Sequence, residues 1–166
     1  GATTQGPPLA TQADPARPYA DLWDRPGSIV RRLHQVHMGL FAEECAETGL
    51  TPVQYGMLSV LSSGRHFDQL SLSSAVGIDR TSGADVIKRL ARRGLLERST
   101  SEQDRRAKVI RITAEGRALV EQMRAPMARA QERFIAPLTG DERAEFFRLL
   151  RKILAANDEA SRAPLA

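Results

Sequence analysis

Two short helical segments, followed at once by two short β-rich runs, constrain the fold of this chain more than any other feature. The segments "FDQLSLSSAVGID" and "DRTSGADVIKRLARRG" each open on an expected N-cap, Asp68 and Asp79, and Gly77 allows the bend between them. The runs over 95–99 and 109–112 are typical of a hairpin. A helix-turn-helix continued by a hairpin predicts a winged helix-turn-helix. Its expected core-facing residues are Leu70, Ala75, Val76, Val86, Ile87 and Leu90.

Longer helical patterns lie on both sides of this unit. Apolar residues recur at helical spacing over 26–48, where Asp24 is the expected cap, and a second helix starts at the cap Thr51 and stops near Gly64. Two further helices begin at the caps Thr113 and Thr139. The predicted fold class is therefore mainly α with a small β-hairpin wing.

The chain divides into three predicted parts. Residues 1–18 contain four of the nine prolines and few apolar residues, which predicts a disordered arm. Residues 51–112 form the predicted winged helix-turn-helix, and 19–50 together with 113–160 form a separate helical region.

Composition narrows the class of protein. The 166 residues contain a single cysteine, Cys45, which excludes an internal disulfide framework and a multi-cysteine metal site. There is no apolar run long enough to span a membrane and no secretory leader pattern, so we expect a cytoplasmic protein. The sequence has no nucleophile motif, HExxH or glycine-rich phosphate loop, so we expect no enzymatic activity, no cofactor and no bound metal.

The positive charge is concentrated in one segment. From Asp79 to Arg111 there are ten Lys or Arg and five Asp or Glu, a net charge of +5, so the rest of the chain, with 14 positive and 15 negative residues, has a net charge of −1. A local basic patch favours a polyanionic partner, and the helix pair makes double-stranded DNA the expected one.

The second helix of the pair is the expected recognition helix, with its start in the major groove. Gly83 is costly inside a helix, and close approach to DNA or to another helix would compensate. Arg92 and Arg93 are expected to form a solvated basic end. The exposed residues predicted to contact DNA are Arg80, Thr81, Ser82, Asp85, Lys88 and Arg89.

The stretch 79–113, "DRTSGADVIKRLARRGLLERSTSEQDRRAKVIRIT", resembles the core signature of the MarR family of bacterial transcription regulators. The resemblance extends over 24–158 and implies a nucleoid-associated homodimer whose first and last helices form the interface, and which reads a pseudo-palindromic operator. The alternative is that these helices pack only within one chain. In the wing, Asp104 is implied to hold Arg106. Arg105, or Arg105 and Arg106 together, would reach the minor groove, and Lys108 would lie near phosphate.

The first helix carries a candidate effector site. "RPGSIVRRLHQVHMGLF" resembles the "PGxLxRRxxQxxH" start of MarR members that sense aromatic carboxylic acids, the protocatechuate-responsive type among them. By this resemblance Arg31 binds the carboxylate and His37 contacts a ring substituent, and His34 offers a further bond. The alternative is intersubunit ion pairs and a satisfied histidine. The predicted apolar walls are Trp23, Met38, Phe41 and Tyr55.

The leading hypothesis is thus a repressor that a small aromatic acid releases from DNA. Two alternatives are a redox sensor acting through Cys45 and a DNA-binding protein without allostery. The peroxide-sensing branch has its reactive cysteine near the start of the first helix, whereas Cys45 lies near the end, among Glu43, Glu44 and Glu47. These carboxylates raise the pKa of a thiol, so we expect an inert one. A urate response is rejected because Gly56 replaces the acidic residue expected after Tyr55.

Overall fold

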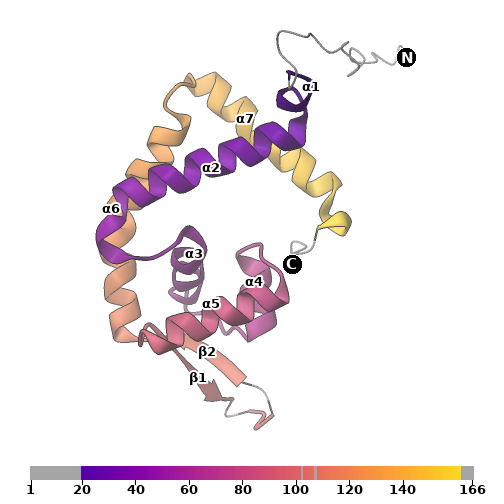
Figure 1. Cartoon of the computed structure of the whole chain (residues 1–166). Coiled ribbons are helices and arrows are strands. Elements are labelled where there is room, and N and C mark those ends of the chain that lie inside the picture. The colour runs from indigo at the N-terminus through magenta and orange to yellow at the C-terminus, as the bar shows by residue number, and fades with distance from the viewer. Residues whose placement is uncertain (1–19, 102, 107, 162–166) are drawn as a thin grey trace.

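A computed structural model describes residues 20–101, 103–106 and 108–161 (Figure 1). The predicted arm over 1–18 lies outside these residues. In chain order the elements are α1 (Ala20–Trp23), α2 (Pro26–Glu44), the 3-10 turn η1 (Ala46–Thr48), α3 (Pro52–Leu61), α4 (Gln69–Ala75), α5 (Arg80–Arg92), β1 (Leu96–Thr100), β2 (Lys108–Ile112), α6 (Ala114–Ile135), α7 (Gly140–Ala156) and the 3-10 turn η2 (Asp158–Ala160).

Five helices begin where the sequence places an N-cap. In each case the cap side chain accepts a hydrogen bond from the backbone N–H three residues later, which satisfies one of the unpaired amides of the first turn. α3, α4 and α7 have the reciprocal capping box as well. These confirmed caps are Thr51, Asp68, Asp79, Thr113 and Thr139.

α2 begins at Pro26 as predicted, but its cap residue and its end differ from the prediction. Arg25 is the N-cap, without a side-chain cap bond, so the prediction of Asp24 as the cap is wrong. Pro26 explains the start, since its fixed φ suits the first helical position and its missing N–H needs no partner. The helix ends at Glu44 instead of 48, and η1 leads into Gly49, whose φ of +64° favours glycine.

The inward face of α4 is also different from the prediction. Leu70 and Ala75 are exposed, and the buried residues are Leu72 and Ser73. α4 has only seven residues, fewer than two turns of a helix, so apolar spacing alone cannot fix which side faces the core. Tight packing against α5 selects this face.

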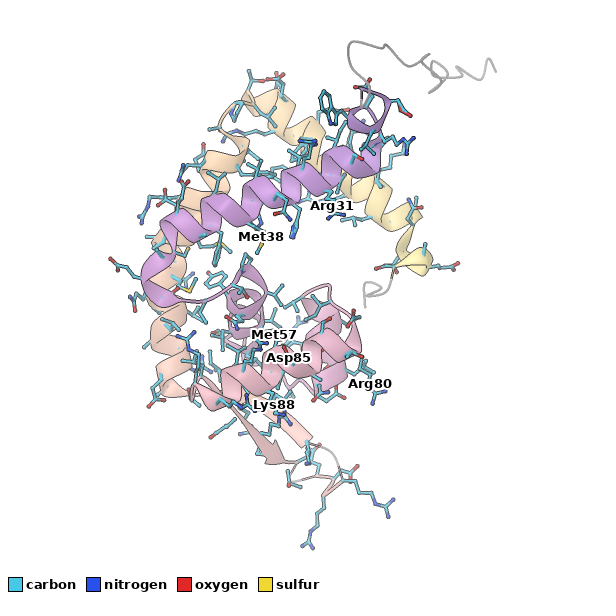
Figure 2. All side chains as sticks on the ribbon, in the orientation of Figure 1. Arg31, Met38, Met57, Arg80, Asp85 and Lys88 are labelled. Carbon is cyan, nitrogen blue, oxygen red and sulfur yellow. The ribbon has the colours of Figure 1, made fainter. Side chains whose placement is uncertain are left out.

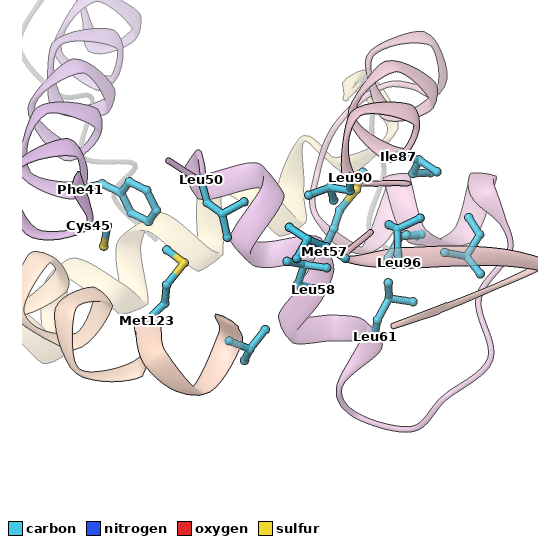
Figure 3. Packing of buried hydrophobic residues seen from close by; sticks show 14 residues of the cluster. Phe41, Cys45, Leu50, Met57, Leu58, Leu61, Ile87, Leu90, Leu96 and Met123 are labelled. Carbon is cyan, nitrogen blue, oxygen red and sulfur yellow. The ribbon is translucent and has the colours of Figure 1, made fainter. Parts of the chain in front are cut away.

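One hydrophobic core joins the winged unit to the end of α2 and the start of α6. Figure 3 shows Phe41 and Cys45 on α2 close to Met123 on α6, with Leu50 between them and α3. The core therefore fixes α2 and α6 over the winged unit. The buried apolar members are Phe41, Cys45, Leu50, Met57, Leu58, Leu61, Leu72, Ile87, Leu90, Leu95, Leu96, Ile110, Val120 and Met123.

The hairpin confirms the predicted wing. β1 and β2 are antiparallel, with Leu96 opposite Ile112 and Arg98 opposite Ile110, and Phe67 forms an isolated bridge to Ile110. Leu96 and Ile110 are buried, so one face of the hairpin packs on the core. The strands extend to Thr100 and from Lys108, within one residue of the predicted ranges.

The remaining helices form a frame above the winged unit. Figure 1 shows α2 and α6 side by side, with α7 starting at the top and descending behind α2, while α3, α4, α5 and the hairpin lie below. α7 contributes no buried residue, although its sequence is amphipathic. The frame therefore leaves apolar side chains exposed.

Candidate nucleic-acid interface and effector site

The start of α5 is held tightly against α4. A Cβ at Gly83 would overlap the hydroxyl oxygen of Ser73, and this hydroxyl is fixed because it donates to the Gln69 carbonyl at 2.7 Å. Gly83 is buried, so its missing side chain allows the close approach of α4 and not of DNA. Of the two explanations given for this glycine, close approach to another helix is confirmed.

The side chains of α5 that are predicted to contact DNA are exposed to solvent. Figure 2 shows Arg80, Asp85 and Lys88 along one exposed side of this helix. Asp85 forms an ion pair with Arg89 at 3.0 Å, so it holds a cation in place on this face. All six predicted residues are exposed, namely Arg80, Thr81, Ser82, Asp85, Lys88 and Arg89.

The wing tip differs in one detail from what the resemblance implied. Asp104 accepts a hydrogen bond from the backbone N–H of Arg106 at 2.9 Å, and no ion pair to Asp104 occurs among the described residues. Asp104 therefore holds Arg106, as the resemblance implied, but through the backbone amide and not through the guanidinium. An aspartate commonly bonds the amide two residues later, which closes a tight turn. Arg105, Arg106 and Lys108 are exposed.

A groove runs between α5 and the hairpin, which we call the helix–wing groove. It consists of a hollow of about 720 Å³ and a second one of about 370 Å³, and Gln69 and Arg98 line both. Sequence analysis did not assign Arg98 to a site, whereas Arg92 is exposed as predicted and also lines the groove. The other residues that line the groove are Asp68, Leu70, Arg80, Ala84, Lys88, Ala91, Arg92, Arg106, Lys108 and Ile110.

Arg93 is exposed, as was expected for this basic end of the helix, but its guanidinium also has a partner within the chain. Its Nη2 donates to the Thr48 carbonyl oxygen at 3.0 Å. Because Thr48 belongs to η1, this bond ties the end of the recognition helix to the segment that follows α2.

The predicted effector residues are spread along α2. Arg31 and His34 are exposed, and Figure 2 places Arg31 and Met38 on the side of α2 that faces the winged unit. A helix rises about 1.5 Å per residue, so Trp23 and Phe41 stand about 25 Å apart along α1 and α2. These two residues therefore cannot both contact one small ligand within a single chain.

The predicted wall residues have other contacts. Phe41 is only 2% exposed and lies in the core, and Tyr55 is partly buried against that core. The Arg32 guanidinium lies 5.9 Å from the centre of the Trp23 ring, within the range of a cation–π contact. Within one chain Phe41 therefore belongs to the core, and its role as an apolar wall of an effector site stays a prediction.

His37 is held by α6. Its Nε2 is 3.0 Å from Nε2 of Gln131, and its ring meets Phe134 edge-on with centroids 5.8 Å apart. Partial burial, followed by the charge of His34, lowers the pKa of His37, so the neutral ring is favoured. His37 is thus satisfied within one chain, as the alternative interpretation expected, although its partner is not across an interface.

Cys45 is buried beside Phe41 and is 4% exposed. Burial raises the pKa of its thiol, and the nearby Glu44 carboxylate raises it further, while Arg129 acts in the opposite direction. Glu44 itself is bound by Arg129 at 3.0 Å and by Arg133 at 3.2 Å. These directions favour the unreactive thiol over the thiolate.

Comparison with known proteins agrees with this geometry. Residues 71–116 match the model of a winged helix DNA-binding domain. The chain is 27% identical to the HTH-type transcriptional repressor NicR of Pseudomonas putida, over 86% of this chain and 90% of NicR. The transcriptional regulator PcaV of Streptomyces coelicolor, solved in complex with its natural ligand, is 38% identical over 82% of this chain and 96% of PcaV, with a TM-score of 0.73.

The chain belongs to the MarR family of transcription regulators. A further MarR-type structure describes the regulation of DNA binding of Bordetella bronchiseptica BpsR by 6-hydroxynicotinic acid. BpsR is 30% identical over 79% of this chain and 94% of BpsR, with a TM-score of 0.74.

Membership in the MarR family establishes the general function. The chain is a DNA-binding transcription regulator of the repressor type, and its relatives are regulators, not enzymes. Within the part of the chain that the structure describes, no helix has the length and apolar character needed to cross a membrane.

Proposed function

We propose that this chain is a homodimeric repressor that binds a pseudo-palindromic operator and is released by a small aromatic carboxylic acid. One observation supports the proposed dimer. Of the ten large apolar side chains that are exposed among the described residues, nine lie on α1, α2 and α7. Such a concentration of exposed apolar side chains on a few helices is typical of an interface between copies. The nine are Leu22, Trp23, Ile29, Val30, Val36, Phe147, Leu149, Ile153 and Leu154.

The connection between interface and DNA runs through α6. This helix starts at Thr113, directly after the wing, and its other half is bound to α2 through Arg129–Glu44 and Gln131–His37. A dimer must hold its two recognition helices about 34 Å apart to read two half-sites. A ligand that stabilises a different position of α2 relative to the winged unit changes this separation and lowers DNA affinity.

The side chain of Arg31 indicates the chemical class of the effector. Its guanidinium is a bidentate partner for carboxylate, and Arg31 lies on the side of α2 that faces the winged unit (Figure 2). The regulation of BpsR by 6-hydroxynicotinic acid, an aromatic carboxylic acid, supports an effector of this class, and PcaV in complex with its natural ligand supports a bound effector in general. Since one chain does not bring Trp23 and Phe41 together, Arg31 and Met38 are the residues proposed to contact the ligand first.

The test measures binding of the dimer to the DNA upstream of its own gene, with and without hydroxybenzoates, hydroxycinnamates and nicotinates. At least one acid is expected to weaken binding by tenfold or more. Arg31→Ala should bind DNA like wild type but fail to respond, because only the group that binds the ligand is removed. Arg32→Ala is the matched control, since Arg32 stacks on Trp23, and it should keep the response. A wild-type affinity that no acid changes would contradict the effector proposal.

A further inference from the structure

Arg98 lies where an apolar residue would be expected. Successive strand residues alternate between two faces, so Leu96, Arg98 and Thr100 of β1 share the face that packs on the core. The partner opposite Arg98 is Ile110, which is buried. Arg98 is nevertheless exposed, and none of the described carboxylates forms an ion pair with it. Its charge is therefore available in the helix–wing groove.

The whole helix–wing groove is cationic. Its single acidic residue is Asp68, whose carboxylate accepts the N–H of Ser71 at 2.7 Å as the cap of α4. That hydrogen bond lowers the pKa of Asp68 and engages its charge locally. The groove thus presents a strong positive field to any anion that enters. The cations that line it are Arg80, Lys88, Arg92, Arg98, Arg106 and Lys108.

The groove also has an apolar patch that the core does not use. Leu70 is 59% exposed and is the one large exposed apolar side chain outside α1, α2 and α7 among the described residues. It lines the smaller hollow together with Arg98 and Arg106. Positive charge beside an exposed leucine fits a chain of phosphates joined by sugars, because a deoxyribose has an apolar face while a free phosphate ion has none.

The position of the groove identifies this chain of phosphates. When α5 lies in a major groove and the wing in the adjacent minor groove, one DNA strand separates the two elements. That strand must cross the space between α5 and the hairpin, which is the helix–wing groove. We propose that the groove binds this strand, with Arg98 bonded to a phosphate and Leu70 packed on a deoxyribose. The inference rests on DNA binding by this protein and adds two residues to those predicted.

The experiment measures binding of the full chain to its operator and to a random duplex over a series of salt concentrations. Arg98→Ala should weaken both duplexes by the same factor, about tenfold, because a charged hydrogen bond to the backbone carries no sequence information. The slope of log affinity against log salt should fall by about 0.9 for each phosphate that the variant no longer neutralises. Arg98→Lys keeps the charge and should retain most of the slope.

Leu70→Ala gives a separate readout. It should weaken both duplexes by a few-fold and leave the salt slope unchanged, because it removes no charge. Arg111→Ala is the matched control, since Arg111 lies on β2 and pairs with Glu97, on the other face of the hairpin. Thermal unfolding of each variant confirms that the fold is retained.

The outcomes separate DNA binding from the groove assignment. A wild-type protein that binds neither duplex would overturn DNA binding itself. Wild-type binding together with an unchanged Arg98→Ala affinity would overturn only the groove assignment. An affinity decrease for Arg111→Ala as large as that for Arg98→Ala would do the same, since it would show an effect of total charge and not of a specific bond. A decrease confined to the operator would assign Arg98 to base recognition instead.

Discussion

Gly83 illustrates how one residue decides the geometry of the DNA-binding unit. An alanine there gains about 0.5–1 kcal/mol of helix propensity, but its Cβ would overlap the Ser73 side chain. Overpacking of a tight contact costs about 1–3 kcal/mol. We therefore expect Gly83→Ala to lower the free energy of unfolding, measured by urea denaturation at fixed protein concentration, and to weaken operator binding.

The matched suppressor of this change is Ser73→Gly. It removes the two atoms that a Cβ at 83 would meet first, and the next nearest atom, the Ser73 Cα, is at 3.5 Å. The double variant should recover part of the operator affinity. If Gly83→Ala alone is as stable as wild type and binds the operator equally well, the helix-packing explanation of this glycine is wrong.

At the scale of elements, the wing depends on a turn and not on an ion pair. Asp104 accepts the Arg106 amide, so it fixes the loop that presents Arg105 and Arg106. Simple charge counting predicts that Asp104→Ala binds DNA more tightly, because it removes a negative charge. We expect weaker binding, since ordering each released side chain costs about 0.5–1.5 kcal/mol on association.

The sign of the Asp104→Ala effect is measured by fluorescence anisotropy with operator DNA. Asp104→Asn is the control, because its side-chain oxygen still accepts the Arg106 amide while the charge is gone. It should bind at least as tightly as wild type. Tighter binding by both variants would show that charge, not the turn, determines the contribution of the wing.

The elements differ in how well sequence predicts them. Local rules placed the caps Asp79 and Thr113 and both strands, because caps and alternation depend on neighbours in the chain. They failed for the buried face of α4, which is too short to show a period. Contacts between distant positions, such as Arg93 with Thr48 and Arg129 with Glu44, follow from packing and are not encoded in any local pattern.

For the candidate site as well, sequence predicts local features but not the contacts that depend on packing. The exposed residues of α5 could be identified from helical spacing alone. Arg98 could have been found by alternation in β1, since it shares a face with Leu96, but its place in a groove required the position of α5. The effector residues were assigned by resemblance, and the structure separates Trp23 on α1 from Phe41 because most of the length of α2 lies between them.

At the scale of the whole molecule, α7 has no buried residue within one chain. Phe146 and Leu150 of its apolar face are only partly buried, so α7 gains little from tertiary contacts, which supply most helical stability in proteins. A second copy that covers α7 and the exposed face of α2 would provide this burial and would place two winged units on one operator. If the proposed dimer forms, operator recognition depends on the oligomeric state.

Replacing Ile153 with Glu tests directly whether α7 forms part of a dimer interface. Ile153 is 59% exposed in one chain, so a charge there costs little in a monomer but would be buried and unpaired in a dimer. Light scattering after size exclusion should give the dimer mass for wild type and the monomer mass for Ile153→Glu. Operator affinity should fall by orders of magnitude, because a single winged unit contacts one half-site. Lys152→Glu, a larger charge change on the polar side of α7, should leave the dimer intact. A dimeric Ile153→Glu protein, or a monomeric wild type, would place the interface elsewhere or exclude it.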